Sequence, residues 1–309
     1  MATDSPQAGT GVIHDIGYQR YQGTRLGRFQ IAQALCWHSL RSAFGIRRGA
    51  KAKIVPVLTF VIMCTPAVVN AVAMAASQQH TRILHYDTYV NSLRVLVMLV
   101  FVAAQAPELV ARDLRSKVLP LYFARPIRRS DYPAAKYAAF ALACLAMIDI
   151  PVLLLYIGTI LQIHGGSAIW AETKAAIPGL LVGLMWALVL AAVGLALACV
   201  SGRRAFSTGA VAIFLFLTFT LSHVLTAIAQ QTQGPATFAG GGSSGAAALF
   251  GLISPFTVLD GVRQWLGGTS PGIVADPGSY GIAYGIMLLA FLALSLAGLF
   301  ARYATADLA

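Results

Sequence analysis

The chain has 309 residues, of which 58% are hydrophobic and only 11% are charged, and its mean hydropathy is +0.72. This composition excludes an ordinary soluble globular protein and predicts an all-α membrane protein with several spans. The net charge of +11 does not predict nucleic-acid binding. The basic residues flank apolar segments, where anionic lipid headgroups attract them, and they form no patch on a soluble domain.

Residues 1–52 are predicted to form a cytoplasmic tail that ends in an amphipathic helix. A helical wheel over residues 28–44 gathers apolar side chains on one arc and polar side chains opposite it. The arc comprises Phe29, Ala32, Cys36, Trp37, Leu40, Ala43 and Phe44. Such a helix is expected to lie in the membrane interface, with Trp37 at the level of the lipid headgroups.

Residues 53–309 are predicted to form one transmembrane domain of six helices. Six apolar segments approach or exceed the roughly 20 residues that a helix needs to cross the hydrocarbon core. These segments are residues 54–76, 90–110, 137–163, 177–200, 209–229 and 280–300.

The distribution of Lys and Arg predicts the orientation of these spans. Eighteen of the 22 basic residues lie before the first span, in the connectors after the second and fourth spans, or in the tail, and only three lie in the other connectors. Lys and Arg accumulate on the cytoplasmic side of short loops. Both termini are therefore expected to be cytoplasmic, in a multi-pass protein of the inner (plasma) membrane.

The connector between the second and third spans, residues 112–136, is basic and partly amphipathic. A short helix is expected over residues 113–124, with Asp113 near its amino end. Pro120 is expected to kink or divide this helix, and Pro126 to end it before a second helix starts. The apolar face of the helix comprises Leu114, Val118, Leu121 and Tyr122. Because a simple connector needs only a few residues, we favour a surface that docks a partner over a solvated run of charges.

This connector resembles the first cytoplasmic loop in the membrane subunits of ABC-2 type exporters. In that family the loop contains an acidic residue, a short coupling helix, a Pro-hydrophobic-x-Arg turn, a Tyr, and a Lys that opens the third span. The matching residues are Asp113, Leu119, Leu121, Pro126, Ile127, Arg129, Tyr132 and Lys136. The six spans, the amphipathic helix before them and the long segment before the last span also resemble this family.

The resemblance implies a permease subunit of a bacterial ABC exporter, which pairs with a second permease subunit, identical or different, to form the export path. It also implies a separate ATP-binding subunit that holds ATP and Mg and receives the connector in a cleft. The residues expected to couple the two subunits are Asp113, Leu114, Val118, Leu121, Tyr122, Pro126 and Arg129.

The chain is expected to have no ATPase site of its own. A P-loop requires a Lys followed by Ser or Thr, whereas the five lysines of this chain are followed by Ala, Ile, Val or Tyr. We also expect no catalytic, cofactor or metal site. The GxSG sequence at residues 242–245 is followed by no His that could activate a serine nucleophile, and His80, His85 and Asp87 form only a loose cluster in a short loop.

Two acidic residues fall within predicted spans. Asp149, beside Pro151, is expected to face protein rather than lipid, because a carboxylate in the hydrocarbon core costs about 2.5–3.5 kcal/mol. Two roles are possible for Asp149. It functions in gating, substrate contact or proton handling, or it forms a structural hydrogen bond within the span. An ion- or proton-coupled secondary transporter that uses Asp149 is therefore an alternative function, and a nontransporting scaffold is a third. Glu108 is expected to pair locally with Arg112.

The weakly charged segment over residues 231–279 is expected to carry one or two re-entrant or interfacial helices on the external side. Ser254 followed by Pro255 predicts a helix start, and Gly267 predicts a helix end. Two GxxxG patterns, at residues 179–183 and 281–285, are expected to serve packing between helices within the chain.

Overall fold

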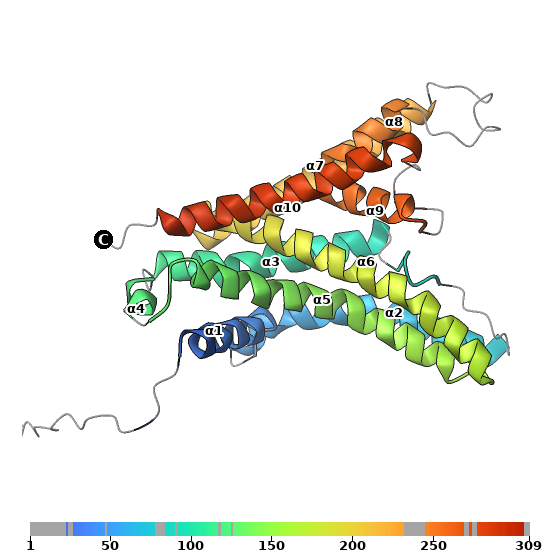
Figure 1. Cartoon of the computed structure of the whole chain (residues 1–309), viewed down its shortest axis with the longest axis horizontal. Coiled ribbons are helices and arrows are strands. Elements are labelled where there is room, and N and C mark those ends of the chain that lie inside the picture. The colour runs from blue at the N-terminus through green and yellow to red at the C-terminus, as the bar shows by residue number, and fades with distance from the viewer. Residues whose placement is uncertain are drawn as a thin grey trace, which may run out of the picture.

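A computed structural model describes residues 23, 27–46, 48–77, 84–89, 92–116, 119–124, 126–231, 245–268, 272–273 and 277–305. Every regular element among these residues is helical, which confirms the all-α prediction. In chain order (Figure 1) the elements are α1 (Arg28–Ala43), α2 (Ala50–Ser77), α3 (Ser92–Arg115), α4 (Leu119–Phe123), α5 (Asp131–Ile160), α6 (Gly166–Ala198), α7 (Arg204–Gln231), α8 (Gly245–Phe250), η2 (Gly251–Ile253), α9 (Pro255–Trp265), η3 (Gly278–Tyr280) and α10 (Gly281–Ala304).

Six of these helices, α2, α3, α5, α6, α7 and α10, are long and apolar enough to cross a membrane, as predicted. Each overlaps its predicted segment, but some begin earlier: α5 begins at Asp131 rather than at residue 137, and α6 begins at Gly166 rather than at residue 177. The hydropathy pattern marks only the apolar part of a helix, whereas the backbone hydrogen bonds continue into its polar flanks.

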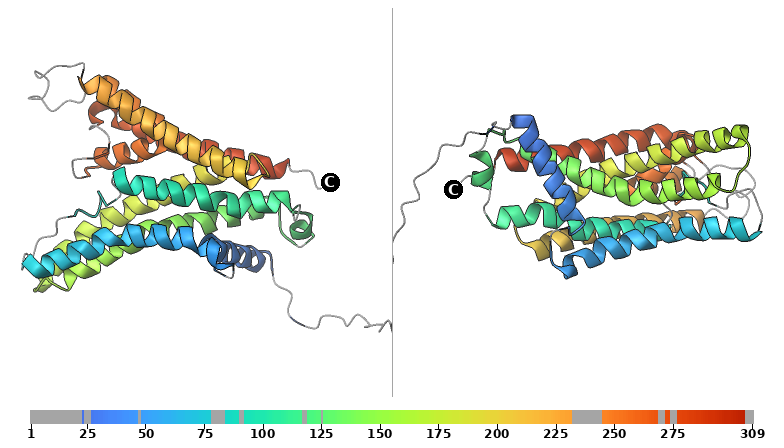
Figure 2. Two further views of the ribbon diagram at one scale, coloured as in Figure 1. Left: turned by 180° about the vertical axis from the view of Figure 1, so that it is seen from behind. Right: turned by 90° about the horizontal axis from the view of Figure 1, so that it is seen from below.

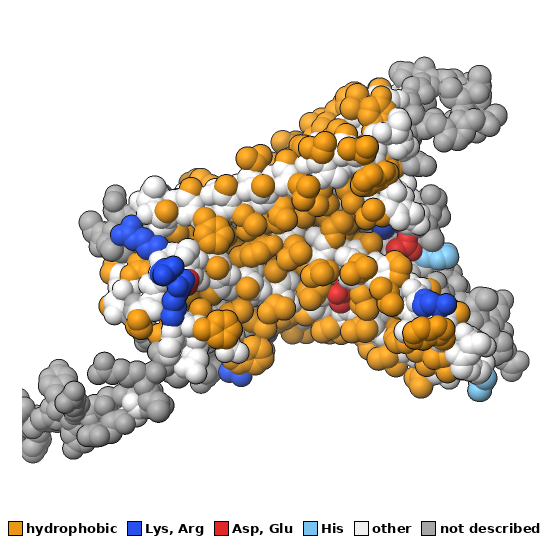
Figure 3. Space-filling view, in the orientation of Figure 1, with side chains coloured by type: hydrophobic (Ala, Val, Ile, Leu, Met, Phe, Trp, Pro, Cys, Tyr) orange, Lys and Arg blue, Asp and Glu red, His pale blue; other side chains and the backbone are white. Residues whose placement is uncertain are grey.

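Successive spans run in opposite directions, so that α1, α4 and the carboxyl end of α10 lie at the same end of the bundle (Figure 1). We call it the basic end, because Arg48, Arg112, Arg129, Arg204 and Arg302 lie there. In Figure 3, Lys and Arg gather mainly at this end, and the surface along the spans is mostly hydrophobic.

The pair α3 and α6 forms the centre of the bundle. α2 and α5 lie on one side of this pair, and α7 and α10 lie on the other. The two sides are close together at the basic end and diverge toward the opposite end, where α8 and α9 lie against α7 and α10 (Figures 1 and 2). In the apolar stretch of α3, 78% of the residues are buried, against 11% in α10. α3 is therefore the enclosed span, and α10 leaves most of its surface uncovered.

Glycine allows close approach of neighbouring elements at both GxxxG patterns. Gly183 of α6 lies against Asp149 of α5, and Gly281 of α10 lies against the ring of Trp265. A side chain added at either glycine would overlap its neighbour. These patterns serve packing within the chain, as predicted.

The first helix, α1, lies across the ends of the spans rather than along them (Figure 2). It contacts α5 and α3, and its buried residues are Leu35, Ser39 and Ala43. Phe29 and Trp37 of the predicted apolar arc are 78% and 54% exposed, so the bundle does not cover them, and their place in the membrane interface stays a prediction. The small side chains of Ser39 and Ala43 allow α1 to approach the spans closely, and this contact turns Phe29 and Trp37 outward.

The segment before the last span contains the predicted helix, α9. The Ser254 side chain accepts a hydrogen bond from the N–H of Phe256 at 3.3 Å, and Pro255 is the first residue of the helix. Gly267 follows the end of α9 with a φ of +91°, a conformation that glycine adopts without steric cost. α9 contacts α6, α7 and α10. Residues 242–244 of the GxSG sequence lie outside the described residues.

Candidate coupling site and charged residues of the bundle

The connector after α3 is not the single helix that the sequence predicted. α3 continues to Arg115, and α4 comprises only Leu119–Phe123. Pro120 is tolerated in the first turn of α4, where the N–H that proline lacks would have no intrahelical partner. Asp113 therefore lies in the last turn of α3, and its predicted position at the amino end of a connector helix is wrong.

Asp113 joins the end of α3 to the start of α5. Its Oδ2 accepts a hydrogen bond from the Tyr132 hydroxyl at 2.6 Å and forms an ion pair with Lys136 Nζ at 2.8 Å. Tyr132 is fully buried, and the side chains of Asp113 and Lys136 are only 18% and 6% exposed. Both ends of the connector are thus fixed to each other by a shielded contact.

Asp113→Ala is expected to lower the free energy of unfolding by about 3 kcal/mol, because it leaves the shielded Lys136 ammonium without a counter-charge. Thermal unfolding of the purified protein in detergent measures this loss. Arg28→Ala is the matched control: it removes an ion pair whose cation is 45% exposed, and the Asp131 carboxylate keeps the N–H of Arg128 as a partner, so a smaller loss is expected. Equal losses in the two variants would show that Asp113 matters no more than a surface charge.

The short helix α4 is held in place by a cluster of aromatic rings. The ring centre of Tyr132 lies 5.4 Å from that of Tyr122, 6.4 Å from that of Phe123 and 5.1 Å from that of Tyr303. Such ring pairs contribute about 0.5–1.5 kcal/mol each beyond the burial of their area. Leu119 of α4 is also buried. The cluster attaches α4 to the start of α5 and the end of α10.

The residues of the predicted apolar face do not form one surface. Leu121 of α4 is 71% exposed, whereas Leu114 and Tyr122 are half-buried and pack against the core of the bundle. Val118 lies outside the described residues. The predicted face assumed a continuous helix, and the break between α3 and α4 puts its two halves out of register. Leu121 is the large apolar side chain that α4 exposes.

Pro126 and Arg129 are both exposed in the segment that follows α4. Arg129 donates a hydrogen bond to the backbone oxygen of Ala304 at 3.0 Å, at the carboxyl end of α10, where helix carbonyls lack intrahelical partners. Asp131 accepts hydrogen bonds from Arg28 of α1, and this interaction raises the pKa of the Arg28 guanidinium. Polar contacts therefore connect α1, α5 and α10 around α4.

Asp149 lies on α5 with its carboxylate against Gly183 of α6. Its Oδ1 is buried and has no hydrogen-bond partner among the described residues. The structural hydrogen bond that the sequence allowed is therefore not made by this oxygen. A buried polar atom without a partner costs free energy, and ionisable residues within spans commonly mark functional sites. Asp149 remains a candidate functional residue.

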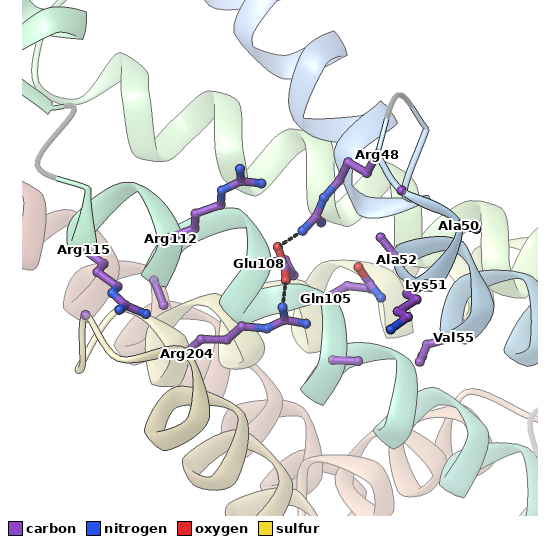
Figure 4. A pocket seen from close by; sticks show the side chains of 14 residues that line it. Arg48, Ala50, Lys51, Ala52, Val55, Gln105, Glu108, Arg112, Arg115 and Arg204 are labelled. Carbon is purple, nitrogen blue, oxygen red and sulfur yellow. Dashed lines mark hydrogen bonds and ion pairs between the residues drawn. The ribbon is translucent and has the colours of Figure 1, made fainter.

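Glu108 is the second acidic residue in a span, and its predicted pairing with Arg112 is wrong. It is buried on the central helix α3 and forms ion pairs with Arg48, which precedes α2, and with Arg204, the first residue of α7 (Figure 4). A shielded carboxylate is stabilised more by two charged donors than by one arginine a turn away. The pairs connect α2, α3 and α7 at the basic end.

A third charged cluster lies at the opposite end of the bundle and was not predicted. Arg263 of α9 forms ion pairs with Asp260, on the same helix, and with Asp87, in the loop before α3, both at 2.9 Å. The three side chains are at most 12% exposed. Asp87 and Arg263 are 176 residues apart in the chain, so no local pattern indicated their contact. The cluster connects this loop to α9.

Residues 81–257 match the family model described as ABC-2 family transporter protein. The match covers more than half of the chain and includes the spans α3, α5, α6 and α7, the connector with α4, and both Glu108 and Asp149. A comparison with curated proteins gave no match. Together with the six helices that can cross a membrane, the family match identifies a multi-pass membrane protein with a transport role. The chain belongs to the ABC-2 family of transporter proteins.

Proposed function

We propose that this chain is the permease subunit of an ATP-binding cassette exporter and that a separate ATP-binding subunit, which holds ATP and Mg, docks at its basic end. Family membership supports the transport role. The observation that carries the docking proposal is Leu121, which is 71% exposed on a short helix outside the spans. Exposed apolar surface costs about 25 cal/mol per Å² in water unless a partner or the membrane covers it.

The coupling surface consists of Leu121 at its centre, with Pro126 and Arg129 in the segment that follows α4. Tyr122 and Asp113 position α4. The ring of Tyr122 packs against that of Tyr132, and Asp113 joins α3 to α5. When the partner displaces α4, the spans α3 and α5 are therefore expected to move with it. The ring contact and the shielded Asp113 contact support this role, since a loosely attached helix would move without moving α3 and α5.

The basic end is proposed to face the cytoplasm, with both termini inside and the protein in the inner membrane. The gathering of Lys and Arg at this end (Figure 3) supports this orientation, because basic residues accumulate on the cytoplasmic side of short connectors. Two permease subunits are proposed to form the export path. Exposed apolar side chains on the outer spans, such as Val69, Ile213 and Leu294 at 59%, 65% and 74%, leave surface for lipid and for the second subunit.

A second candidate function is an ion- or proton-coupled secondary transporter that uses Asp149. The observation that favours it is the buried Oδ1 without a partner among the described residues, because carboxylates that take up and release cations within a membrane need such an open position. The ABC-2 family match favours the ATP-driven permease over this alternative.

Purified alone, the chain is expected neither to bind nor to hydrolyse ATP above background, because none of its lysines is followed by Ser or Thr. Reconstituted in proteoliposomes with its ATP-binding subunit, it is expected to support ATP hydrolysis that persists when ionophores collapse all ion gradients. Stoichiometric nucleotide binding by the isolated chain would contradict the permease assignment. Proton uptake that Asp149→Asn abolishes, without any dependence on ATP, would favour the secondary transporter instead.

A further inference from the structure

A pocket of about 980 Å³ lies at the basic end between α2, α3 and α7 (Figure 4). Its lining carries an excess of positive charge: five basic residues against one acidic residue, namely Arg48, Lys51, Arg112, Arg115 and Arg204 against Glu108. Arg48 and Arg204 already engage Glu108. Within the described part of the chain, the side chains of Lys51, Arg112 and Arg115 form no hydrogen bond or ion pair. The pocket therefore attracts an anion from outside the chain.

A largely buried glutamine, Gln105, contributes its amide to the pocket wall. Gln105 is only 4% exposed, lines the pocket, and forms no side-chain hydrogen bond with any described residue. Gln105 of α3 and Lys51, in the first turn of α2, both line the pocket (Figure 4). Because Gln105 lines the pocket, its amide is available to donate a hydrogen bond to a group held there. The N–H groups at the start of α2, at Ala50 and Lys51, also favour a negative charge in the pocket.

An apolar stripe leads from the pocket along α3. Ala104 lines the pocket, and Val100 and Leu96 lie one and two turns away on the same helix face. They are 49% and 39% exposed, although α2 and α7 both contact α3. A free anion would contact only the pocket and not this stripe. A phospholipid matches both parts, because it carries a charged phosphate and apolar chains.

We propose that this pocket binds the phosphate group of an anionic phospholipid, with an acyl chain along Val100 and Leu96. Planar guanidinium groups bind phosphate oxygens through paired hydrogen bonds, and basic pockets between spans bind anionic headgroups. The lipid contacts α2, α3 and α7 together and so stabilises their arrangement beside Glu108. The site does not depend on an ATP-binding subunit. Only its assignment to the inner leaflet depends on the proposed orientation.

The test uses the variant Lys51→Gln/Arg112→Gln/Arg115→Gln, which leaves the ion pairs of Glu108 in place. Native mass spectrometry of the full chain in detergent measures how much lipid is retained from an equal mixture of phosphatidylglycerol and phosphatidylcholine. The wild type is expected to retain phosphatidylglycerol preferentially. The variant is expected to lose this preference at least about tenfold, since each Lys or Arg beside an anionic headgroup contributes roughly fivefold to binding.

The matched control is Lys53→Gln/Arg128→Gln/Arg203→Gln, which removes the same charge from exposed residues that do not line the pocket. This control is expected to keep the preference of the wild type. Should the pocket variant fail to fold, Gln105→Leu replaces it: this change removes no charge and is expected to reduce retention several-fold.

Two results would overturn the proposal: no preference for phosphatidylglycerol in the wild type, or the same preference in the pocket variant and the control. A second experiment compares glycerol 3-phosphate and inorganic phosphate with phosphatidylglycerol by their effect on the unfolding temperature of the wild type. If either raises the unfolding temperature of the wild type as much as phosphatidylglycerol does, the ligand is a free phosphate and the lipid assignment is wrong. Stabilisation by phosphatidylglycerol alone supports the lipid.

Discussion

Leu121→Asp is expected to release the ATP-binding subunit from this permease and to abolish the ATP hydrolysis that depends on the complex. A central apolar anchor commonly contributes about 2 kcal/mol or more to an interface, which corresponds to roughly a 30-fold loss of affinity. The unpaired carboxylate that the change places in the contact adds to this loss. Because Leu121 is 71% exposed, the permease itself should still fold. Copurification stoichiometry and ATP hydrolysis in proteoliposomes measure the effect.

The matched control for this prediction is Leu161→Asp. Leu161 follows α5 at the opposite end of the bundle and is 78% exposed, so the change adds the same charge at a similarly exposed leucine far from α4. It is expected to leave the ATP-binding subunit bound. If Leu121→Asp copurifies with that subunit at wild-type stoichiometry and stays active, Leu121 belongs to the lipid-facing surface and the docking proposal is wrong.

The spans and the start of α9 could be predicted because their determinants are local. A helix in hydrocarbon must satisfy its own backbone hydrogen bonds, so a run of about 20 apolar residues has few alternatives. Ser254 and Pro255 act within one turn, through a side-chain cap and a fixed φ. In both cases the residues that dictate the structure are consecutive in the chain.

The partners of charged residues could not be predicted, because they depend on how the helices pack. Glu108 has Arg112 one turn away, yet its carboxylate pairs with Arg48 and Arg204. The sequence alone does not show that the segments before α2 and α7 both lie beside Glu108 of α3. Local spacing identifies a possible pair, but burial of the carboxylate on an enclosed helix decides which pair forms.

The surface proposed for coupling differs in part from the predicted face, because a helical wheel does not show where a helix ends. Leu114 and Leu121 share a face only if one helix joins them, and α3 and α4 are separate. The helical wheel puts Tyr122 beside Leu121, but the ring of Tyr122 packs against that of Tyr132. A change at Tyr122 would loosen α4 itself, so it cannot distinguish docking from stability. Only the structure singles out Leu121 as the residue that probes docking.

Arg263→Met is expected to be among the most destabilising single changes in the chain, with a loss of about 3–5 kcal/mol, because it leaves two buried carboxylates without their shared cation. The Asp260 and Asp87 side chains are 3% and 12% exposed, so water screens them little. Lys174→Met is the matched control. Lys174 is exposed on α6, where such a change usually alters stability by about 0.5 kcal/mol or less. Thermal unfolding of both variants in detergent measures the difference.

Removing the two carboxylates as well is expected to restore part of this stability. The variant Asp87→Asn/Asp260→Asn/Arg263→Met buries no charge, and replacing a buried ion pair by neutral residues of similar size is often close to neutral. If this variant unfolds at no higher temperature than Arg263→Met alone, the loss comes from the packing of the arginine stem rather than from its charge. A rescue would instead show that ion pairing connects the loop before α3 to α9, and that this end of the bundle is stabilised by electrostatic contacts where its two sides diverge.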